Sequence, residues 1–313
     1  MILERSLKTL VNVNLWQTEF WEKRRDLLFR VLEDYGFTSG RGAVLAFQEV
    51  LRGEKDPYSG NNTAYDPVEE VCQALGFTTA DHLHFFPLRK GGPFGLAILS
   101  DLPLLRQSNQ VLTYLPQIED RQRNTGVVEL LTSKLPTVVA TTQITSKNER
   151  GLSYHQVDDL EWAIRKFIIT ADDFSTEEKN NLQMVNLKCL TGRRNIVMAL
   201  DLNNCPHTAA YRRLKRSGLV DITCGLRRKV KYTWPVDPEW LAELNVREKL
   251  RMDPGQEQYQ VRYAQEVDQF RSWQRPVDYI FCGGLVPQRA ELIGSERFKG
   301  MYPSDHLLQA IYF

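Results

Sequence analysis

Segments with strand character and segments with helical character alternate along the whole chain, and this alternation constrains the fold more than any other feature. Residues 9–15 alternate their side chains with the period of a strand, and 16–35 carry apolar residues at helical spacing. Further apolar runs indicate strands over 43–47, 96–100, 127–131, 136–144, 195–200, 277–281 and 307–313. Because no repeat or linker interrupts this order, we expect one α/β domain over residues 1–313.

Two stretches fit the alternation poorly and are predicted to be insertions. Residues 170–192 are polar and show no clear period, whereas 236–275 carry a long helical pattern that breaks at Asp253-Pro254-Gly255. The second stretch places Tyr259 and Tyr263 on one stripe and ends near Trp273. It suits a packing face, and it could also serve as a docking surface for a protein partner.

The composition is that of an ordinary globular enzyme, with 42% hydrophobic and 25% charged residues. No apolar run approaches the roughly 18 residues that a membrane-spanning helix needs, so no transmembrane segment is expected. The first ten residues carry three charges, unlike a secretory signal. Five scattered cysteines indicate free thiols and a soluble protein in a reducing, intracellular compartment. Nothing here indicates the oligomeric state or the organelle.

Basic residues concentrate between positions 212 and 231, although the net charge of the chain is only +1. The segment contains one acid, Asp221, and eight basic residues: Arg212, Arg213, Lys215, Arg216, Arg227, Arg228, Lys229 and Lys231. A run of this kind is usually a solvated face. The alternative is a local footprint for a phosphate backbone.

Polar residues stand where the apolar strands end. The set comprises Asn12, Glu49, Asp201 with Asn203, Asp278, and Asp305 with His306. Asp201 and Asn203 lie two residues apart, so on an extended chain their side chains point the same way. Each residue alone has an ordinary explanation as a cap or a turn. Together, carboxylates, amides and one imidazole are the groups that phosphoryl chemistry with a hard divalent cation requires.

The order of these residues and their flanks resembles the endonuclease/exonuclease/phosphatase superfamily over nearly the whole chain. Ser304-Asp305-His306 is similar to the most specific of its motifs, the terminal Ser-Asp-His. The other similar segments are Val11-Asn12-Val13, Phe47-Gln48-Glu49, Gly95-Leu96-Ala97-Ile98-Leu99-Ser100, Asp201-Leu202-Asn203, Tyr232-Thr233-Trp234-Pro235 and Val277-Asp278-Tyr279-Ile280-Phe281.

The resemblance implies a four-layer sandwich in which two mixed β-sheets lie face to face between helices. It also implies a site for Mg²⁺ or Mn²⁺, with Glu49 as a ligand, Asn12 assisting and Asp305 close to the metal. Asp201 would orient or deprotonate the attacking water. Asn203 would contact the scissile phosphate.

In the same comparison His306, held by Asp278, would stabilise or protonate the transition state at phosphorus.

Two positions depart from the family pattern. Gln143 stands where many members have a phosphate-binding histidine, and Leu200 replaces the glycine before the Asp201 motif. A glutamine can donate a hydrogen bond but carries no positive charge, so transition-state stabilisation should be weaker.

Three functions remain open at this point. The favoured hypothesis is a metal-dependent phosphodiesterase, a nuclease acting on DNA or RNA, for which Asn14, Arg212 and Arg213 are the candidate substrate contacts. A second keeps the fold and acts on a phospholipid or an inositol phosphate. The third is a catalytically weak or inactive member that binds a partner through the site or through 236–275.

Overall fold

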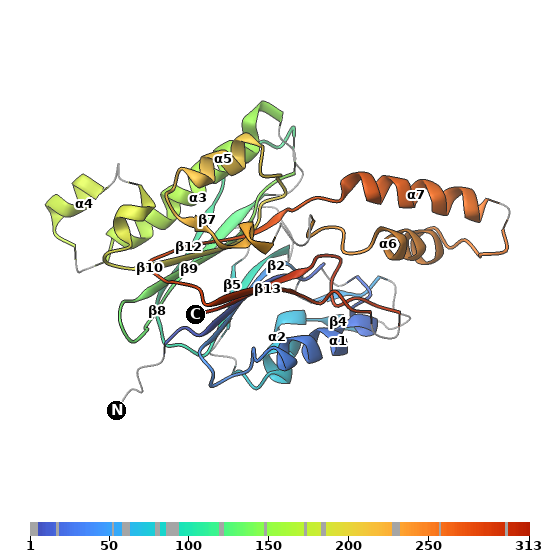
Figure 1. Cartoon of the computed structure of the whole chain (residues 1–313), viewed down its shortest axis with the longest axis horizontal. Helices are drawn as coiled ribbons and strands as arrows, with labels where there is room; N and C mark the ends of the chain where they lie inside the picture. Colours follow the sequence, from blue (N-terminus) through green and yellow to red (C-terminus); the bar gives the residue numbers. More distant parts are fainter. Residues whose placement is uncertain are drawn as a thin grey trace.

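Two six-stranded mixed sheets form the centre of the protein (Figure 1). The computed structural model describes residues 6–16, 19–51, 53–57, 63–78, 82–85, 94–118, 122–146, 149–171, 174–182, 186–226, 232–256, 258–297 and 300–313. Sheet I has the order β13 (Arg289–Ile293), β14 (Leu308–Tyr312), β1 (Thr9–Asn14), β2 (Ala43–Leu51), β6 (Phe94–Ser100), β5 (His82–Phe85).

Sheet II has the order β11 (Val220–Asp221), β12 (Asp278–Gly283), β10 (Asn195–Asp201), β9 (Thr137–Gln143), β8 (Asn124–Leu130), β7 (Leu104–Val111). The central pairs β1–β2 and β9–β10 are parallel, whereas the other pairs in both sheets are antiparallel. A small hairpin of β3 (Glu54–Lys55) and β4 (Ala64–Tyr65) lies outside both sheets.

The described helices lie around the two sheets. They are α1 (Trp21–Asp34), α2 (Pro67–Ala74), α3 (Leu152–Ile169), α4 (Thr176–Leu182), α5 (Ala209–Lys215), α6 (Pro238–Leu244) and α7 (Tyr259–Trp273). Figure 1 places α1 and α2 beside sheet I and α3 and α5 beside sheet II. The expected four-layer α/β sandwich is therefore confirmed.

Strand alternation explains the layers. In β1, Leu10 packs between the sheets with apolar residues of β10 and β12, whereas Val11 and Val13 pack toward α1 and α2. Asn12 and Asn14 follow Leu10 on the face between the sheets, where both are almost fully buried. Buried amides require hydrogen-bond partners, so these two positions mark a polar region inside an otherwise apolar interface.

The structure changes several predicted element bounds. Helix α1 begins at Trp21 rather than at residue 16, because Trp16 and Phe20 adopt left-handed backbone conformations with φ of 51° and 53°. The sequence patterns did not indicate β5, β7 or β13. Strands β7 and β13 lie at or near sheet edges, and much of their surface is exposed, which removes the apolar alternation.

The stretch 236–275 forms a helical hairpin that reaches beyond the sheets (Figure 1). It contains α6, a π-helical turn over Asn245–Lys249, and α7. Its base is anchored where Trp240 packs with Trp16, Phe20 and Tyr302. The stretch 170–192 holds α4 and a 3₁₀ turn over Leu187–Leu190.

All five cysteines are free thiols, as predicted. Within the part of the chain that the structure describes, every helix is too short or too polar to cross a membrane.

Candidate active site

Polar side chains from both sheets meet at one edge of the sandwich. The register places Asp201 opposite Gln143 on one side and opposite Asp278 on the other, while Asn14 lies opposite Gln48 in sheet I. The amide of Asn12 bridges the two sheets, because its Nδ2 donates to the Leu200 carbonyl at 3.1 Å. The structure thus brings together residues that lie far apart in the sequence, such as Asn14 and His306, which are 292 positions apart and both lie beside Asp201.

Gln48 completes the bridge between the sheets. Its Nε2 donates to Asn12 Oδ1 and to Thr141 Oγ1, both at 2.8 Å. Since both ends of the Asn12 amide already have protein partners, its first role in this structure is to join sheet I to sheet II. Sequence reasoning did not assign a role to Gln48, although its position directly before Glu49 was the available signal.

Asp201 lies at the centre of the site and is fully buried. One carboxylate oxygen accepts from Gln143 Nε2 at 2.8 Å and from Asn14 Nδ2 at 3.1 Å. The other accepts from the backbone N–H of Asn203 at 3.1 Å. Burial raises the pKa of Asp201 to about 7, and the neighbouring charges of Asp278 and Glu49 add to this effect. A carboxylate with a pKa near neutrality suits a general base.

His306 and Asp278 form a buried pair with Nδ1 and Oδ2 2.9 Å apart. Burial alone would disfavour the charged imidazole, but the carboxylates of Asp278 and Asp305 outweigh it and raise the pKa of His306 to about 10. The imidazole is therefore protonated at neutral pH. Thr233 Oγ1 accepts from the backbone amide of Asp278, and Gln309 donates to its carbonyl, which fixes the position of the acid.

Asp305 lies on the loop before β14 and is almost fully buried. Trp234 Nε1 donates to its Oδ2 at 2.9 Å, and Ser304 Oγ lies 3.4 Å from its Oδ1. Burial raises the pKa of Asp305 to about 6, and the charge of Glu49 adds to the increase, whereas His306, Trp234 and Arg24 oppose it. The charge of Glu49 therefore acts on Asp305, as it also acts on Asp201.

Glu49 reaches the site from an irregular position inside β2. The register with β6 shifts between Phe47 and Val50, and Glu49 has a left-handed backbone with φ of 55°. Such a bulge turns a side chain away from the regular alternation and is common next to active sites. Glu49 Oε1 accepts from Gln143 Nε2 at 2.7 Å. The expectation that the strand ends before Glu49 is corrected, because β2 continues to Leu51.

Asn203 also has a left-handed backbone, with φ of 51°, directly after β10. Its Nδ2 donates to the Ile144 carbonyl at 3.0 Å, so the amide group connects the ends of β9 and β10.

Leu200, which replaces the glycine of the family pattern, points away from the site. Its side chain is fully buried in the cluster between sheet II and α3.

The comparisons with known proteins identify the family of the chain. The family model described as "Endonuclease/Exonuclease/phosphatase family" matches residues 12–306, which include every residue of the acid–imidazole site. The chain belongs to this family. No curated protein matches the sequence.

Endonuclease/exonuclease/phosphatase folds among solved structures superpose on nearly the whole chain. Human Nocturnin, solved as a catalytic domain with a bound sulfate anion, is 15% identical, with 99% of this chain and 94% of that chain covered and a TM-score of 0.58. A humanized D. rerio TDP2 is 15% identical, with 97% of each chain covered and a TM-score of 0.56. A mannosyl-6-phosphatase of Bacteroides thetaiotaomicron is 11% identical, with 97% and 98% covered and a TM-score of 0.58. At these identities, the likeness establishes the fold.

Family membership implies a divalent metal, and the residues of the site fit one. Carboxylate oxygens of Asp201 and Asp278 lie within 4.8 Å of each other and of a His306 nitrogen, and the protonated His306 offsets part of their charge and is not itself a ligand. Asp278 Oδ1 is buried and has no hydrogen-bond partner, which leaves a ligand atom available. With Glu49 and Asp305 the site holds four carboxylates against one imidazolium, and oxygen ligands of this kind suit Mg²⁺ or Mn²⁺.

The predicted substrate contacts Arg212 and Arg213 are not in this site. Arg213 lies on α5, where its guanidinium donates to Asp158 and Glu161 of α3, with Nη1 2.8 Å from Glu161 Oε2. Arg212 is exposed on the same helix, on the outer side of sheet II. The order of residues along the chain could not reveal that α5 packs against α3. The basic residues at 227–229 and 231 lie outside the described residues.

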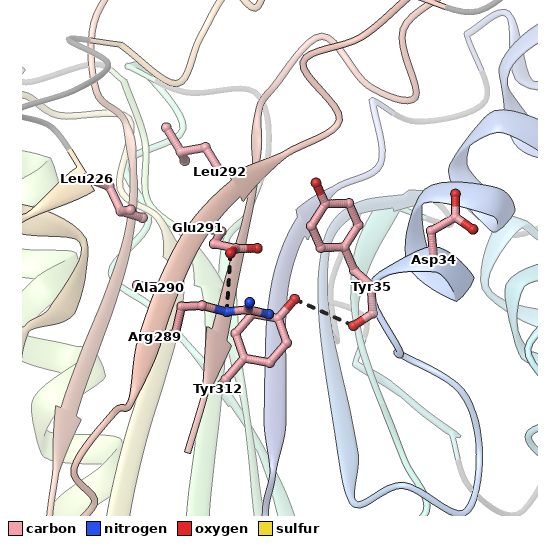
Figure 2. Close-up of a pocket in the computed structure, with 8 residues that line it drawn as sticks. All are labelled: Asp34, Tyr35, Leu226, Arg289, Ala290, Glu291, Leu292 and Tyr312. Carbon is pink, nitrogen blue, oxygen red and sulfur yellow. Dashed lines mark hydrogen bonds and ion pairs between the residues drawn. The ribbon is translucent and has the colours of Figure 1, made fainter.

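A surface pocket lies apart from this site, at the opposite end of β14. Its volume is about 540 Å³, and its lining includes Tyr35, Arg289, Glu291 and Tyr312 (Figure 2). The guanidinium of Arg289 lies 4.1 Å from the centre of the Tyr312 ring and pairs with Glu291. Its lining contains no member of the acid–imidazole cluster, so we assign the chemistry to the strand-end site.

Proposed function

We propose that this chain is a metal-dependent phosphodiesterase that cleaves nucleic acid, either DNA or RNA. The observation that carries the proposal is the buried cluster of Asp201, Asp278 and His306 beside Glu49 and Asp305. Buried carboxylates of this density are destabilising unless a cation or a proton offsets their repulsion. A fold that keeps them in one place, in a family of phosphoesterases, supports a catalytic use.

In this mechanism Glu49 and Asp305, assisted by Asn12, would hold Mg²⁺ or Mn²⁺, which would neutralise charge on the scissile phosphate. Asp201 accepts a proton from the water whose oxygen attacks phosphorus. Its pKa of about 7 means that about half of it is ionised and able to do so at neutral pH.

The other polar groups act on the charge that develops as the phosphorus–oxygen bond of the leaving group breaks. His306, protonated and fixed by Asp278, stabilises that charge or donates its proton to the leaving oxygen. Asn14 and Asn203 contact the phosphate. Gln143 keeps Asp201 and Glu49 in place by donating to both carboxylates.

An aromatic pair beside the site supports a substrate that carries bases. Trp234 and Trp273 stack with ring centres 5.8 Å apart and planes inclined by 14°, and Trp273 is 38% exposed. Trp234 donates to Asp305, and its ring centre lies 6.0 Å from that of His306. Nucleobases stack on exposed aromatic rings in many nucleic-acid sites. One solved TDP2 structure with this fold contains a single-stranded DNA product.

The test compares metal-dependent cleavage of single-stranded and double-stranded DNA and RNA by the wild type, Glu49→Gln and Asp201→Asn. Asp101→Asn is the matched control, because that carboxylate accepts from Gly42 and Ala43 at the opposite end of β2. We expect Mg²⁺- or Mn²⁺-dependent cleavage that both site variants lose and the control keeps. Trp273→Ala should raise KM for oligonucleotides without preventing cleavage.

The alternative functions are separate outcomes of the same screen. Release of phosphate or of a phosphorylated head group from inositol phosphates, sugar phosphates or phospholipids, with intact oligonucleotides, would replace nucleic acid as the substrate. Calorimetry that detects no Mg²⁺ or Mn²⁺ binding would favour the inactive member. In that case the hairpin 236–275 is the surface to test for a protein partner.

A further inference from the structure

Arg24 is a fully buried arginine on the inner side of α1. It occupies the same helical stripe as Phe20, Leu27 and Leu28, where the pattern otherwise requires apolar residues. Its guanidinium lies between two indoles, with its central carbon 5.6 Å from the Trp16 ring centre and 5.2 Å from the Trp21 ring centre. A charge in such a position needs a reason, because its desolvation is costly.

The guanidinium donates to backbone carbonyls from two distant parts of the chain. Nε donates to Glu19 O at 2.7 Å, and Nη2 donates to Leu15 O and to Trp16 O, the latter at 3.3 Å. Nη1 donates to Pro303 O at 2.9 Å, 279 positions away. The planar arrangement of five N–H donors on arginine makes this possible, and no other side chain can reproduce it.

The carbonyls that Arg24 holds belong to the two loops that carry site residues. Leu15 directly follows Asn14, which donates to Asp201. Pro303 begins the loop of Ser304, Asp305 and His306, and Ser304 Oγ donates to the Asn14 carbonyl at 2.7 Å. Arg24 therefore lies behind the point at which the first and last motifs of the site touch.

The turn after β1 also requires support, since Trp16 and Phe20 adopt left-handed conformations that bulky residues rarely occupy. Arg24 accounts for the Leu15, Trp16 and Glu19 carbonyls of this turn, and Asp56 accepts from the Phe20 amide at 3.2 Å. Burial lowers the pKa of Arg24 to about 10, while Asp305 and Asp56 favour its charged form, so it stays protonated at neutral pH.

We propose that Arg24 is a positioning residue that fixes the Asn14 turn against the 304–306 loop and thereby sets the geometry of the active site. The inference rests on the proposed phosphodiesterase function for its catalytic consequence. The structural claim, that Arg24 holds the Asn14 turn against the 304–306 loop, does not depend on which substrate is cleaved.

The experiment compares Arg24→Met and Arg24→Lys with the wild type, and uses Arg194→Met as the matched control. Arg194 is also buried and pairs with Glu129, but it lies before the first residue of β10, at the end opposite Asp201. Two readouts are taken: kcat and KM on the wild-type substrate, and amide hydrogen exchange of the metal-free proteins in peptides covering 14–16 and 303–307.

For Arg24→Met we expect kcat to fall about 100-fold, since a displacement of about 1 Å in a site has this effect, with KM within about threefold. Exchange in 14–16 and 303–307 should accelerate more than in a core peptide of β9. Arg24→Lys keeps the charge but has fewer fixed donors, so its kcat and its loop exchange should lie between those of the wild type and of Arg24→Met. Arg194→Met should lose stability while kcat and the relative exchange of the two loops stay as in the wild type.

The proposal is overturned if Arg24→Met matches Arg194→Met in kcat and in the relative exchange of the two loops. If Arg24→Met does not fold, the same comparison is made with Arg24→Lys. A wild type that cleaves no phosphate ester would instead contradict the proposed function. In that case the exchange data alone would still decide whether Arg24 fastens the loops.

Discussion

Gln143 offers the sharpest test of the catalytic arrangement. Its Nε2 donates to Glu49 at 2.7 Å and to Asp201 at 2.8 Å, while Arg123 donates to its Oε1. The change Gln143→Met keeps a side chain of similar length and removes both donors. It also removes the acceptor of Arg123, so the effect on the two carboxylates is measured by the pH dependence of activity and not by stability.

The structure sets the size of the expected effect. Glu49 is half-buried, so water can replace its lost donor, whereas Asp201 is fully buried. A hydrogen bond to a charged buried group contributes about 1.5–3 kcal/mol. Because this bond favours the ionised form of Asp201, its loss should raise the pKa of Asp201 by about one to two pH units at about 1.4 kcal/mol per unit.

The assay is kcat/KM between pH 5 and 10 on the substrate that the wild type cleaves. If ionised Asp201 is the base, its raised pKa moves the acidic limb of the profile to higher pH. Because Asp201 with a pKa of about 7 is half ionised at pH 7, activity at that pH should then fall about 5- to 50-fold and recover at alkaline pH.

Gln156→Met is the matched control, because Gln156 is equally buried and bonds to the backbone of Thr113 and Thr145, away from Asp201 and Glu49. Gln156→Met should lower the stability of the protein without moving the acidic limb of the pH profile. A limb that stays in place in Gln143→Met, or moves to lower pH, would refute the assignment of Asp201 as the base.

Three further predictions follow from the same contacts. The pKa values of Asp201, Asp305 and His306 are all raised, so the folded state binds more protons than the unfolded state. Melting temperatures in chelator should therefore fall as the pH rises from about 4 to 10, and excess Mg²⁺ should reduce this loss; a melting temperature that rises with pH would contradict it. Asp278→Asn should lower kcat about 100-fold or more, as measured by steady-state kinetics, because His306 loses the partner that orients and charges it; an unchanged kcat would exclude the pair from the reaction. Trp240→Ala should cost about 3–5 kcal/mol of unfolding free energy in urea titrations, because this buried indole anchors the hairpin, and a loss below about 1 kcal/mol would show that the anchor is unimportant.

Much of the architecture could be predicted because strand periodicity determines which side chains face each other. The period of two in residues 9–15 placed Leu10, Asn12 and Asn14 on one face, and the structure turns this face toward sheet II. Polar residues at the ends of apolar strands were expected to converge, and Asp201, Asp278 and His306 do lie together.

The remaining features depend on packing that no local pattern encodes. Strand β7 is exposed along much of its length, so its residues need no apolar alternation. The pairing of Arg213 with α3 was not visible in the sequence, because the contact between α5 and α3 joins residues about 50 positions apart. Arg24 had a usable signal, a charge within an apolar helical stripe, but its partners at Leu15 and Pro303 become visible only in three dimensions.

The bulge at Glu49 has a consequence for how this position tolerates change. A left-handed backbone costs a side-chain-bearing residue about 1–2 kcal/mol, and glycine avoids that cost. In a library of all amino acids at position 49, glycine, asparagine and aspartate should therefore give the highest yield of folded protein, and valine, isoleucine and threonine the lowest. Ranked by turnover, the same library should place glutamate first. The two rankings would differ because the left-handed backbone at this position serves the placement of the glutamate carboxylate and lowers the stability of the fold.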